Sequence, residues 1–225
     1  MSSGRRAYTA LERQRVRQAF IDAGRRILIG QGASGMSMRR IAAEAGYSPG
    51  SIYLYFPDQR ALLAAIRESD MNAATDLMES CALAQPDPAQ RVLDVFNTVA
   101  RYWLAHPDHF DLLFAGSRER VALHTPEGLP FGRSSSVVRS LEFYARVVDD
   151  FLSSLPCRPI DTVLAMAALI AATHGVIAFT RATPSMPWSS TLAMVEIVVD
   201  ALASQWSCQA ERATRGNHRS LNERV

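Results

Sequence analysis

Apolar residues recur at helical spacing along nearly the whole chain, and this pattern restricts the possible folds more than any other feature of the sequence. Nowhere do apolar and polar residues alternate over a strand-length run bounded by turn residues. The first helical pattern begins at Thr9, which forms a capping-box motif with Glu12 ahead of Val16, Phe20 and Ile27. The sequence therefore predicts an all-α protein.

Glycine, proline and capping residues divide the chain into about nine expected helices. Ser37 is expected to cap the second helix, and Ser48 with Pro49 is expected to start the third. The expected helices lie at about 10–29, 38–44, 49–55, 59–84, 89–105, 107–116, 136–154, 159–182 and 190–209. The segment 117–135 is rich in glycine, proline and polar residues and is expected to be a loop.

This pattern predicts two domains and a tail. We expect a small N-terminal domain at 1–58 and a larger helical domain at 59–210. The polar, aperiodic residues 211–225 are expected to be disordered.

Charge is unevenly distributed along the 225 residues. The first 60 residues hold ten arginines and four acidic residues, whereas the rest of the chain is net negative. All 24 basic residues are arginine, and the forked guanidinium group can bind one phosphate through two hydrogen bonds. The N-terminal region is therefore the part that would bind a polyanion.

Two short helices around a glycine turn, between residues 37 and 56, fit a helix-turn-helix. Ile41, Ala42 and Ile52 would lock the two helices together, and the small, polar start of the second helix could enter the major groove of DNA. Arginine, tyrosine and backbone amides around it suit phosphate contacts. The residues expected to contact DNA are Arg39, Arg40, Tyr47, Ser48, Pro49, Gly50, Ser51, Tyr53, Leu54 and Tyr55.

The run GMSMRRIAAEAGYSPGSIYLYFPDQ, from Gly35 to Gln59, resembles the DNA-binding domain of the TetR (tetracycline repressor) family of bacterial regulators. The resemblance covers about residues 10–65 and combines Ile-Ala-x-x-Ala-Gly, a serine before the recognition helix and Tyr-x-x-Phe at its end. The resemblance implies a homodimer whose C-terminal region binds an effector, and binding of the effector changes the spacing of the two DNA-binding domains. It also implies that the protein is a repressor rather than an activator. Family members usually have lysine where this chain has Gln59, so Arg60 is the candidate for that phosphate contact.

The C-terminal region is similar to the domain of some TetR regulators known for Trp, His and Gly positions, on the segments 103–114 and 173–179. The tryptophan usual before the His-Gly step is absent here. Aromatic and soft side chains could line an apolar cavity for a small, mostly apolar effector, or they could simply form the core. The candidates are Trp103, Phe110, Phe114, Phe143, Tyr144, Met166, His174 and Phe179.

The last two helices are expected to form the interface of a homodimer. The stretch 163–179 is apolar, but it is shorter than a membrane span of ~20 residues and has Thr173 and His174 in its middle. The following helix has its own apolar face, and two such helices from each chain would make a four-helix bundle. That face is formed by Leu192, Val195, Val199, Leu202 and Trp206. The alternative is that both are core helices of a monomer.

The sequence offers weaker support for other classes of function than for a DNA-binding regulator. An enzyme is disfavoured because no nucleophile elbow, phosphate loop or close acid pair occurs, and a protein-interaction adaptor is the third class considered.

His106 and His109 could suggest a metal, but Pro107 separates them and no third ligand has a fixed relation to them, so no metal or cofactor is expected. Without a signal-peptide pattern the chain is expected to be cytoplasmic. The free thiols Cys81, Cys157 and Cys208 are expected to be buried, with a redox switch as the alternative.

Overall fold

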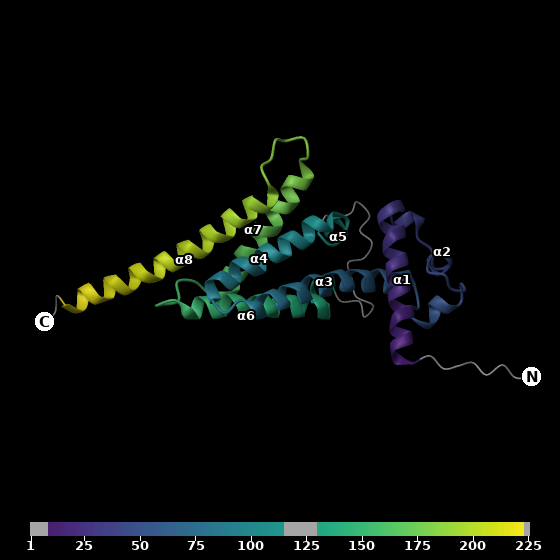
Figure 1. Cartoon of the computed structure of the whole chain (residues 1–225), viewed down its shortest axis with the longest axis horizontal. Helices are drawn as coiled ribbons and strands as arrows, with labels where there is room; N and C mark the ends of the chain where they lie inside the picture. Colours follow the sequence, from purple (N-terminus) through teal and green to yellow (C-terminus); the bar gives the residue numbers. More distant parts are fainter. Residues whose placement is uncertain (1–8, 115–129, 223–225) are drawn as a thin grey trace, which may run out of the picture. The chain divides into compact units, whose positions relative to one another are not determined.

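The structure is a computed structural model that describes residues 9–114 and 130–222 of the chain (Figure 1). Within these ranges it contains eight α-helices and three short 3-10 helices, and no β-strand. The prediction of an all-α fold is confirmed.

The described residues divide into two compact units. The N-terminal unit takes in 9–70 with 130–134, and the C-terminal unit takes in 71–114 with 135–222. The division falls inside helix α3 (Gln59–Ala84), further along the chain than the domain boundary expected from the sequence.

The N-terminal unit begins with helix α1 (Ala10–Gln31), which is followed by η1 (Ala33–Gly35), α2 (Met38–Glu44), η2 (Ser51–Leu54) and the first part of α3. The expected capping box is present, since the Thr9 hydroxyl accepts from the Glu12 amide at 3.1 Å and the Glu12 carboxylate accepts from the Thr9 amide at 2.7 Å. The Ser37 hydroxyl caps α2 by accepting from the Arg40 amide at 3.2 Å. Local capping chemistry therefore sets where these helices begin.

Helix α1 packs closely on the first part of α3 at Gly24, which is buried. A Cβ atom at Gly24 would lie 3.1 Å from Ile66 Cδ1 and 3.2 Å from Leu62 Cδ2. Both of these α3 side chains are fully buried. The missing side chain thus allows the two helices to approach each other.

The C-terminal unit contains the rest of α3 and helices α4 (Pro88–Ala105), α5 (Pro107–Leu113), α6 (Ser135–Ser154), α7 (Thr162–Ala182) and α8 (Thr191–Asn222). The third 3-10 helix, η3 (Phe131–Arg133), precedes α6. Helix α4 contacts α6, α7 and α8, so it is the central helix of this unit (Figure 1). Its buried face includes Phe96, Val99 and Trp103.

Helices α5, α7 and α8 have boundaries that differ from the sequence prediction, and α5 ends at Leu113 rather than near residue 116. Helix α8 continues to Asn222, so the prediction of a disordered tail is wrong for 211–222, whereas 223–225 lie outside the described residues. Helix α7 begins at Thr162 rather than at residue 159, because Asp161 caps it by accepting from the amides of Val163 and Leu164. Most of the expected loop at 117–135 also lies outside the described residues.

Helix α7 is the one described helix that is long and apolar enough to cross a membrane, with a mean hydropathy of 2.0 over its most apolar window. Only 22% of that window is buried. One face of α7 packs inside the unit through Ala165, Leu169 and Ile177, and the opposite face is exposed. A face of small and apolar residues is therefore left uncovered on this helix.

Candidate functional site

The turn of the helix-turn-helix depends on Gly46, which has a φ of +79°. The amide of Gly46 donates to the Ala43 carbonyl at 3.0 Å, and the amide of Tyr47 donates to the Ala42 carbonyl at 2.9 Å. Residues with a side chain rarely adopt positive φ, so glycine allows the chain to leave α2 and turn toward η2.

The expected third helix is shorter and tighter than the sequence predicts. It is a 3-10 helix over Ser51–Leu54, not an α-helix over 49–55, and its N-cap residue is Gly50. The predicted cap at Ser48 is also wrong: the Ser48 carbonyl accepts from the Ser51 amide at 3.0 Å and the Ser51 hydroxyl at 2.6 Å. Ser48 itself is exposed, and its hydroxyl forms no hydrogen bond to any described residue.

The 3-10 helix separates inward from outward side chains sharply. Ile52 is fully buried with Ile41 of α2, whereas Tyr53 is 56% exposed and Leu54 is 84% exposed. Ser48, Pro49 and Gly50 are exposed and Ser51 is half-buried. This end of the unit therefore presents a small, polar edge next to two protruding apolar side chains.

Tyr47 and Tyr55, both expected at the DNA surface, are half-buried and pack on α1. Their ring centroids lie 5.1 Å and 5.6 Å from that of Phe20, which is fully buried. The two tyrosines thus hold the turn and the end of η2 against α1. They position the exposed edge between them.

Arginines surround this edge. Arg39 and Arg40 are exposed on α2, as predicted, and Arg40 donates to the Gly35 carbonyl at 3.4 Å. Arg60 is 71% exposed and only 4.0 Å from the Asp58 carboxylate. Sequence reasoning missed Arg17, whose guanidinium carbon lies 5.1 Å from the centre of the Phe56 ring. Its place beside the motif depends on α1 packing, which no local pattern reveals.

The eight candidate effector residues fall into separate groups in the C-terminal unit. Trp103, Phe110, Phe114 and His174 form one aromatic cluster, drawn from α4, α5, the end of α5 and α7. The ring centroids of Trp103 and Phe114 are 5.4 Å apart, and those of Phe114 and His174 are 4.8 Å apart. Phe110 stacks on His174 at 6.0 Å.

The other candidates lie elsewhere. Tyr144 stacks on Phe96 at 5.0 Å in the core between α4 and α6, where burial raises the pKa of its hydroxyl. Phe179 is 57% exposed and packs against Trp188. Met166 is half-buried on α7. Four of the eight candidates thus lie together, and the other four do not join them.

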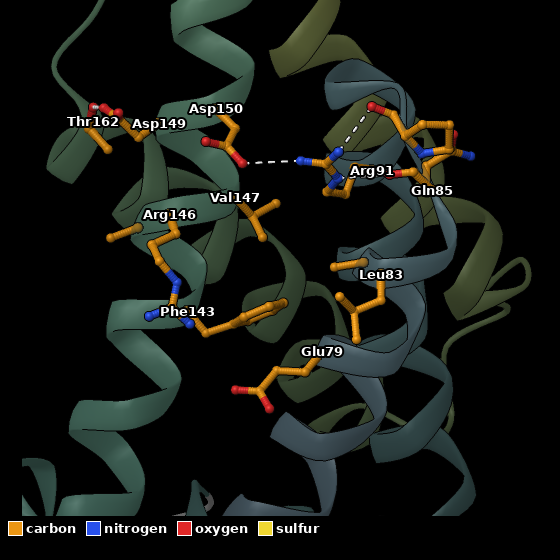
Figure 2. A pocket seen from close by; sticks show the side chains of 13 residues that line it. Glu79, Leu83, Gln85, Arg91, Phe143, Arg146, Val147, Asp149, Asp150 and Thr162 are labelled. Carbon is orange, nitrogen blue, oxygen red and sulfur yellow. Dashed lines mark hydrogen bonds and ion pairs between the residues drawn. The ribbon is translucent and has the colours of Figure 1, made fainter.

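Phe143 lines a groove of about 900 Å³ between α3, α6 and the beginnings of α4 and α7. Figure 2 shows Phe143 and Leu83 pointing into this groove from opposite sides, with the ion pair of Arg91 and Asp150 at one end. The guanidinium carbon of Arg146 lies 6.0 Å from the centre of the Phe143 ring. No member of the aromatic cluster lines the groove.

His106 and His109, considered above as metal ligands, stack on each other with ring centroids 5.0 Å apart. Among the described residues no group of three or more His, Cys, Asp or Glu side chains could hold a metal ion. Cys81 and Cys157 are half-buried, but Cys208 is exposed on α8, contrary to the prediction that all three thiols are buried.

Residues 20–66 match the family model described as "Bacterial regulatory proteins, tetR family". This range contains the whole helix-turn-helix and the beginning of α3, including Leu62 and Ile66, which pack against Gly24 of α1. Residues 20–66 thus identify the N-terminal unit as a DNA-binding domain of the TetR type. Members of this family are DNA-binding transcription regulators.

A curated relative matches part of the chain in sequence, and several solved structures share its fold. The HTH-type transcriptional regulator PksA of Bacillus subtilis is 31% identical over 85 residues, which is 38% of this chain and 42% of the relative. A protein of unknown function from Rhodococcus sp. RHA1 has a similar fold, with a TM-score of 0.69 at 20% identity over 92% of this chain and 100% of the other. The fatty acid degradation regulator FadR of Bacillus halodurans gives 0.68 at 16% identity, over 88% and 97%.

One buried ion pair of the TetR-like unit was not predicted from the sequence. Asp70 of α3, which is 2% exposed, lies 2.7 Å from the guanidinium group of Arg25 on α1. Arg25 also contacts Asp22 at 2.8 Å and the Ser69 hydroxyl at 3.2 Å. Burial raises the pKa of Asp70 to about 6, although the charge of Arg25 opposes the shift. Residues 25 and 70 are too far apart in sequence for any local motif to connect them.

Proposed function

We propose that this TetR-family chain is a sequence-specific DNA-binding regulator that acts as a homodimeric repressor and leaves its operator when a small, mostly apolar effector binds its C-terminal unit. The observation that carries the proposal is the exposed edge from Ser48 to Leu54, which lies in the segment matched by the family model. A small, polar edge of this kind can approach base edges in the major groove closely.

The proposed DNA contacts divide by chemistry. Ser48, Pro49, Gly50 and the exposed Tyr53 and Leu54 are placed to meet bases or thymine methyl groups, and Ser51 lies just beneath them. Arg39, Arg40 and Arg60 suit phosphates, and the hydroxyl groups of Tyr47 and Tyr55 can add further phosphate contacts while their rings hold the edge in place. Arg60 would then take the place of the family lysine that is absent at Gln59.

The proposed dimer interface is the uncovered face of α7 together with the neighbouring exposed face of α8. Exposed residues recur at helical spacing on both helices, and most are small enough for backbones to approach closely. They are Leu164, Ala167, Ala171, Gly175 and Ala178 on α7, and Ile197, Ala201, Ser204 and Cys208 on α8. The apolar face of α8 first considered is used within the chain, since Val195, Val199 and Trp206 are buried. Burial of the α7 face in a dimer would explain its high hydropathy without a membrane.

The effector part of the proposal is supported by the aromatic cluster and by one relative. FadR of Bacillus subtilis, whose fold is similar at a TM-score of 0.61 and 17% identity, was solved in complex with stearoyl-CoA. An effector that binds the DNA-free conformation more tightly would release the operator by shifting the population of conformations. We place the repressor in the cytoplasm, where its DNA is.

Salt-dependent DNA binding tests the interface residue by residue. Operator duplexes would be selected from a random library, and affinity would be measured from 50 to 200 mM salt. Arg39→Ala should weaken binding to all sequences and reduce the slope of log K against log salt by about 1, because one phosphate contact is lost. Tyr53→Ala should weaken specific binding by about tenfold or more and leave that slope nearly unchanged.

The matched control is Arg101→Ala, which removes an exposed arginine of α4 whose surface pair with Glu196 contributes little to stability. This variant should bind DNA as the wild type does. If Arg39→Ala and Tyr53→Ala also bind as the wild type does, the assignment of this edge as the DNA-reading surface is wrong.

A further inference from the structure

The groove of about 900 Å³ in the C-terminal unit has apolar walls on both sides (Figure 2). Phe143 and Val147 of α6 line it and are only 5% and 4% exposed. Leu83 of α3 faces Phe143 across the groove and is 89% exposed. A space of this size accommodates a small organic molecule, and an apolar body between these walls would cover the exposed leucine.

Three carboxylates line the groove, and each lies in an ion pair with an arginine. The pairs are Glu79 with Arg139 at 2.6 Å, Asp149 with Arg158 at 2.6 Å and Asp150 with Arg91 at 3.0 Å. Hydrogen bonds from Arg158 and from the Thr162 hydroxyl lower the pKa of Asp149. A cationic ligand would therefore have to compete with an arginine for any of these carboxylates.

The two arginines that line the groove differ in how their guanidinium groups are used. Nη1 of Arg91 donates to the Asp150 carboxylate at 3.0 Å. Its Nε and Nη2 donate to the carbonyls of Gln85 and Pro86 at 2.8 Å and 2.9 Å. Arg146 is exposed and forms no hydrogen bond or ion pair with any described residue, so its N–H donors are available to a ligand.

The Phe143 ring holds the Arg146 side chain at the groove. The two residues are three apart on α6, so they lie on the same side of the helix. The guanidinium carbon of Arg146 lies 6.0 Å from the centre of the ring, and Figure 2 shows the two groups side by side. A guanidinium on an aromatic ring keeps both its charge and its donors. The groove thus combines apolar walls with one positive charge that the described residues leave unpaired.

This combination selects the chemistry of a ligand. A guanidinium group offers two parallel N–H donors that match the two oxygens of a carboxylate. A single free positive charge balances a monoanion, whereas the second negative charge of a phosphate ester would meet the carboxylates of Asp149 and Asp150 without a partner of its own.

We propose that the groove binds a small monocarboxylate whose charged group accepts hydrogen bonds from Arg146 and whose apolar body lies between Phe143 and Leu83. The groove shares no residue with the aromatic cluster of Trp103, so this site goes beyond the proposed function. Its occupation is measured in the absence of DNA, and the result does not depend on whether the chain binds an operator.

Three probes of nearly the same shape test the charge of the ligand. Biphenyl-4-carboxylate, biphenyl-4-carboxamide and biphenyl-4-carboxamidine are an anion, a neutral molecule and a cation at pH 7. In calorimetric titrations at low salt, the full-length wild type should bind the carboxylate about fivefold more tightly than the carboxamide, because charge-assisted hydrogen bonds are stronger than neutral ones. The preference should shrink at about 0.5 M salt, where an exposed charge is screened.

The carboxamidine tests the opposite charge, since Asp76 and Glu79 share Arg139 and could attract a cation. Binding of the carboxamidine as tight as that of the carboxylate would overturn the proposal. Equal affinity for the carboxylate and the carboxamide, or no binding of either, would overturn it as well.

Arg146→Gln tests the residue that provides the charge. In this variant the preference for the carboxylate over the carboxamide should fall below about twofold, whereas the affinity for the carboxamide should stay the same. The matched control is Arg212→Gln, which makes the same change of net charge at an exposed position of α8 outside the groove. If Arg146→Gln keeps the preference, or if Arg212→Gln loses it equally, Arg146 does not hold the carboxylate.

Leu83→Ala tests the apolar wall. The fold tolerates the change at this exposed position, and both the carboxylate and the carboxamide should bind about threefold more weakly because less apolar surface is covered. Leu77→Ala is the control on the same helix, since Leu77 is 48% exposed and does not line the groove. Equal affinities of the two variants for the carboxylate would show that the probe does not lie in this groove.

Discussion

At the scale of single residues, the geometry of the helix-turn-helix depends most on Gly46. Its φ of +79° belongs to a region that costs a residue with a Cβ atom about 1–2 kcal/mol. A Cβ atom added at Gly46 would have no neighbouring atom within 4 Å. The cost of a substitution there is therefore conformational rather than steric. The sequence predicted a break at Gly46 because glycine is the usual residue for such a turn.

Gly46→Ala should lower the free energy of unfolding by about 1 kcal/mol and weaken DNA binding, because the strained turn would move η2 relative to α2. Urea unfolding and operator affinity would be measured together. Gly30→Ala is the control, since Gly30 lies within α1 with open space around it. That change should leave stability equal or slightly higher, as alanine favours helix. A Gly46→Ala protein as stable as Gly30→Ala would contradict this view of the turn.

The sequence was a better guide to backbone caps than to side-chain partners. Thr9 and Ser37 were predicted as helix caps, and both hydroxyls accept from backbone amides as expected. Asp58 caps α3 in the same way, since its carboxylate accepts from the Ala61 amide at 2.8 Å. Capping depends on neighbours within a few residues, so a local pattern contains the information it needs. Ser48 is not a cap, because the chain there forms a 3-10 helix that begins at Ser51 and has Gly50 as its N-cap residue.

At the scale of secondary-structure elements, the contact between α1 and α3 combines close packing with a buried ion pair. Gly24 lets the helices approach, and Arg25 reaches Asp70 at 2.7 Å. Both helices were predicted from the sequence but their pairing was not, because no pattern within one helix specifies which other helix it packs against. The same limit explains why the candidate effector residues could be chosen by type but not grouped.

The buried carboxyl group of Asp70 should make stability depend on pH. Its pKa is raised from 3.8 to about 6 in the folded chain, so the folded state binds the proton more tightly than the unfolded state does. The resulting stabilisation is complete below pH 4 and is lost as the pH rises through 6. Between pH 7 and pH 5 the wild type should gain roughly 1 kcal/mol relative to Asp70→Asn, which cannot titrate.

Urea unfolding of both proteins at pH 5, 6 and 7 measures this difference directly, and the variant cancels the contribution of all other titrating groups. Asp22 and Arg25 are present in both proteins. A difference between the two proteins that stays constant over this pH range would show that Asp70 keeps an ordinary pKa.

At the scale of the whole molecule, the proposed function requires two copies of the chain. The last two helices were expected to form the dimer interface, but Val195 and Val199, two of the α8 residues expected there, are fully buried within the chain. Hydrophobic periodicity identifies a buried face without telling whether the same chain or a second copy buries it. The exposed face of α7 is the surface available to the proposed second copy of the chain.

Ala171→Glu should convert the dimer to a monomer. Ala171 is exposed in the single chain, so a glutamate there is tolerated by the fold, whereas two buried carboxylates in an interface are not. Sedimentation at micromolar concentration should give the mass of one chain, with helix content unchanged by circular dichroism. Leu83→Glu, at an 89% exposed position of α3, is the control and should stay dimeric. If the Ala171→Glu protein remains dimeric, the dimer interface does not include this face of α7.

Footprinting of DNA bound by the wild-type chain at low ionic strength tests the central claim most directly, that the edge from Ser48 to Leu54 reads duplex DNA once per subunit. Fragments would be enriched from the genome of the source organism and then probed with a nuclease. The account predicts two protected, near-palindromic half-sites whose centres lie about one helical turn or a small multiple apart. Protection of no defined sequence under these conditions would contradict it.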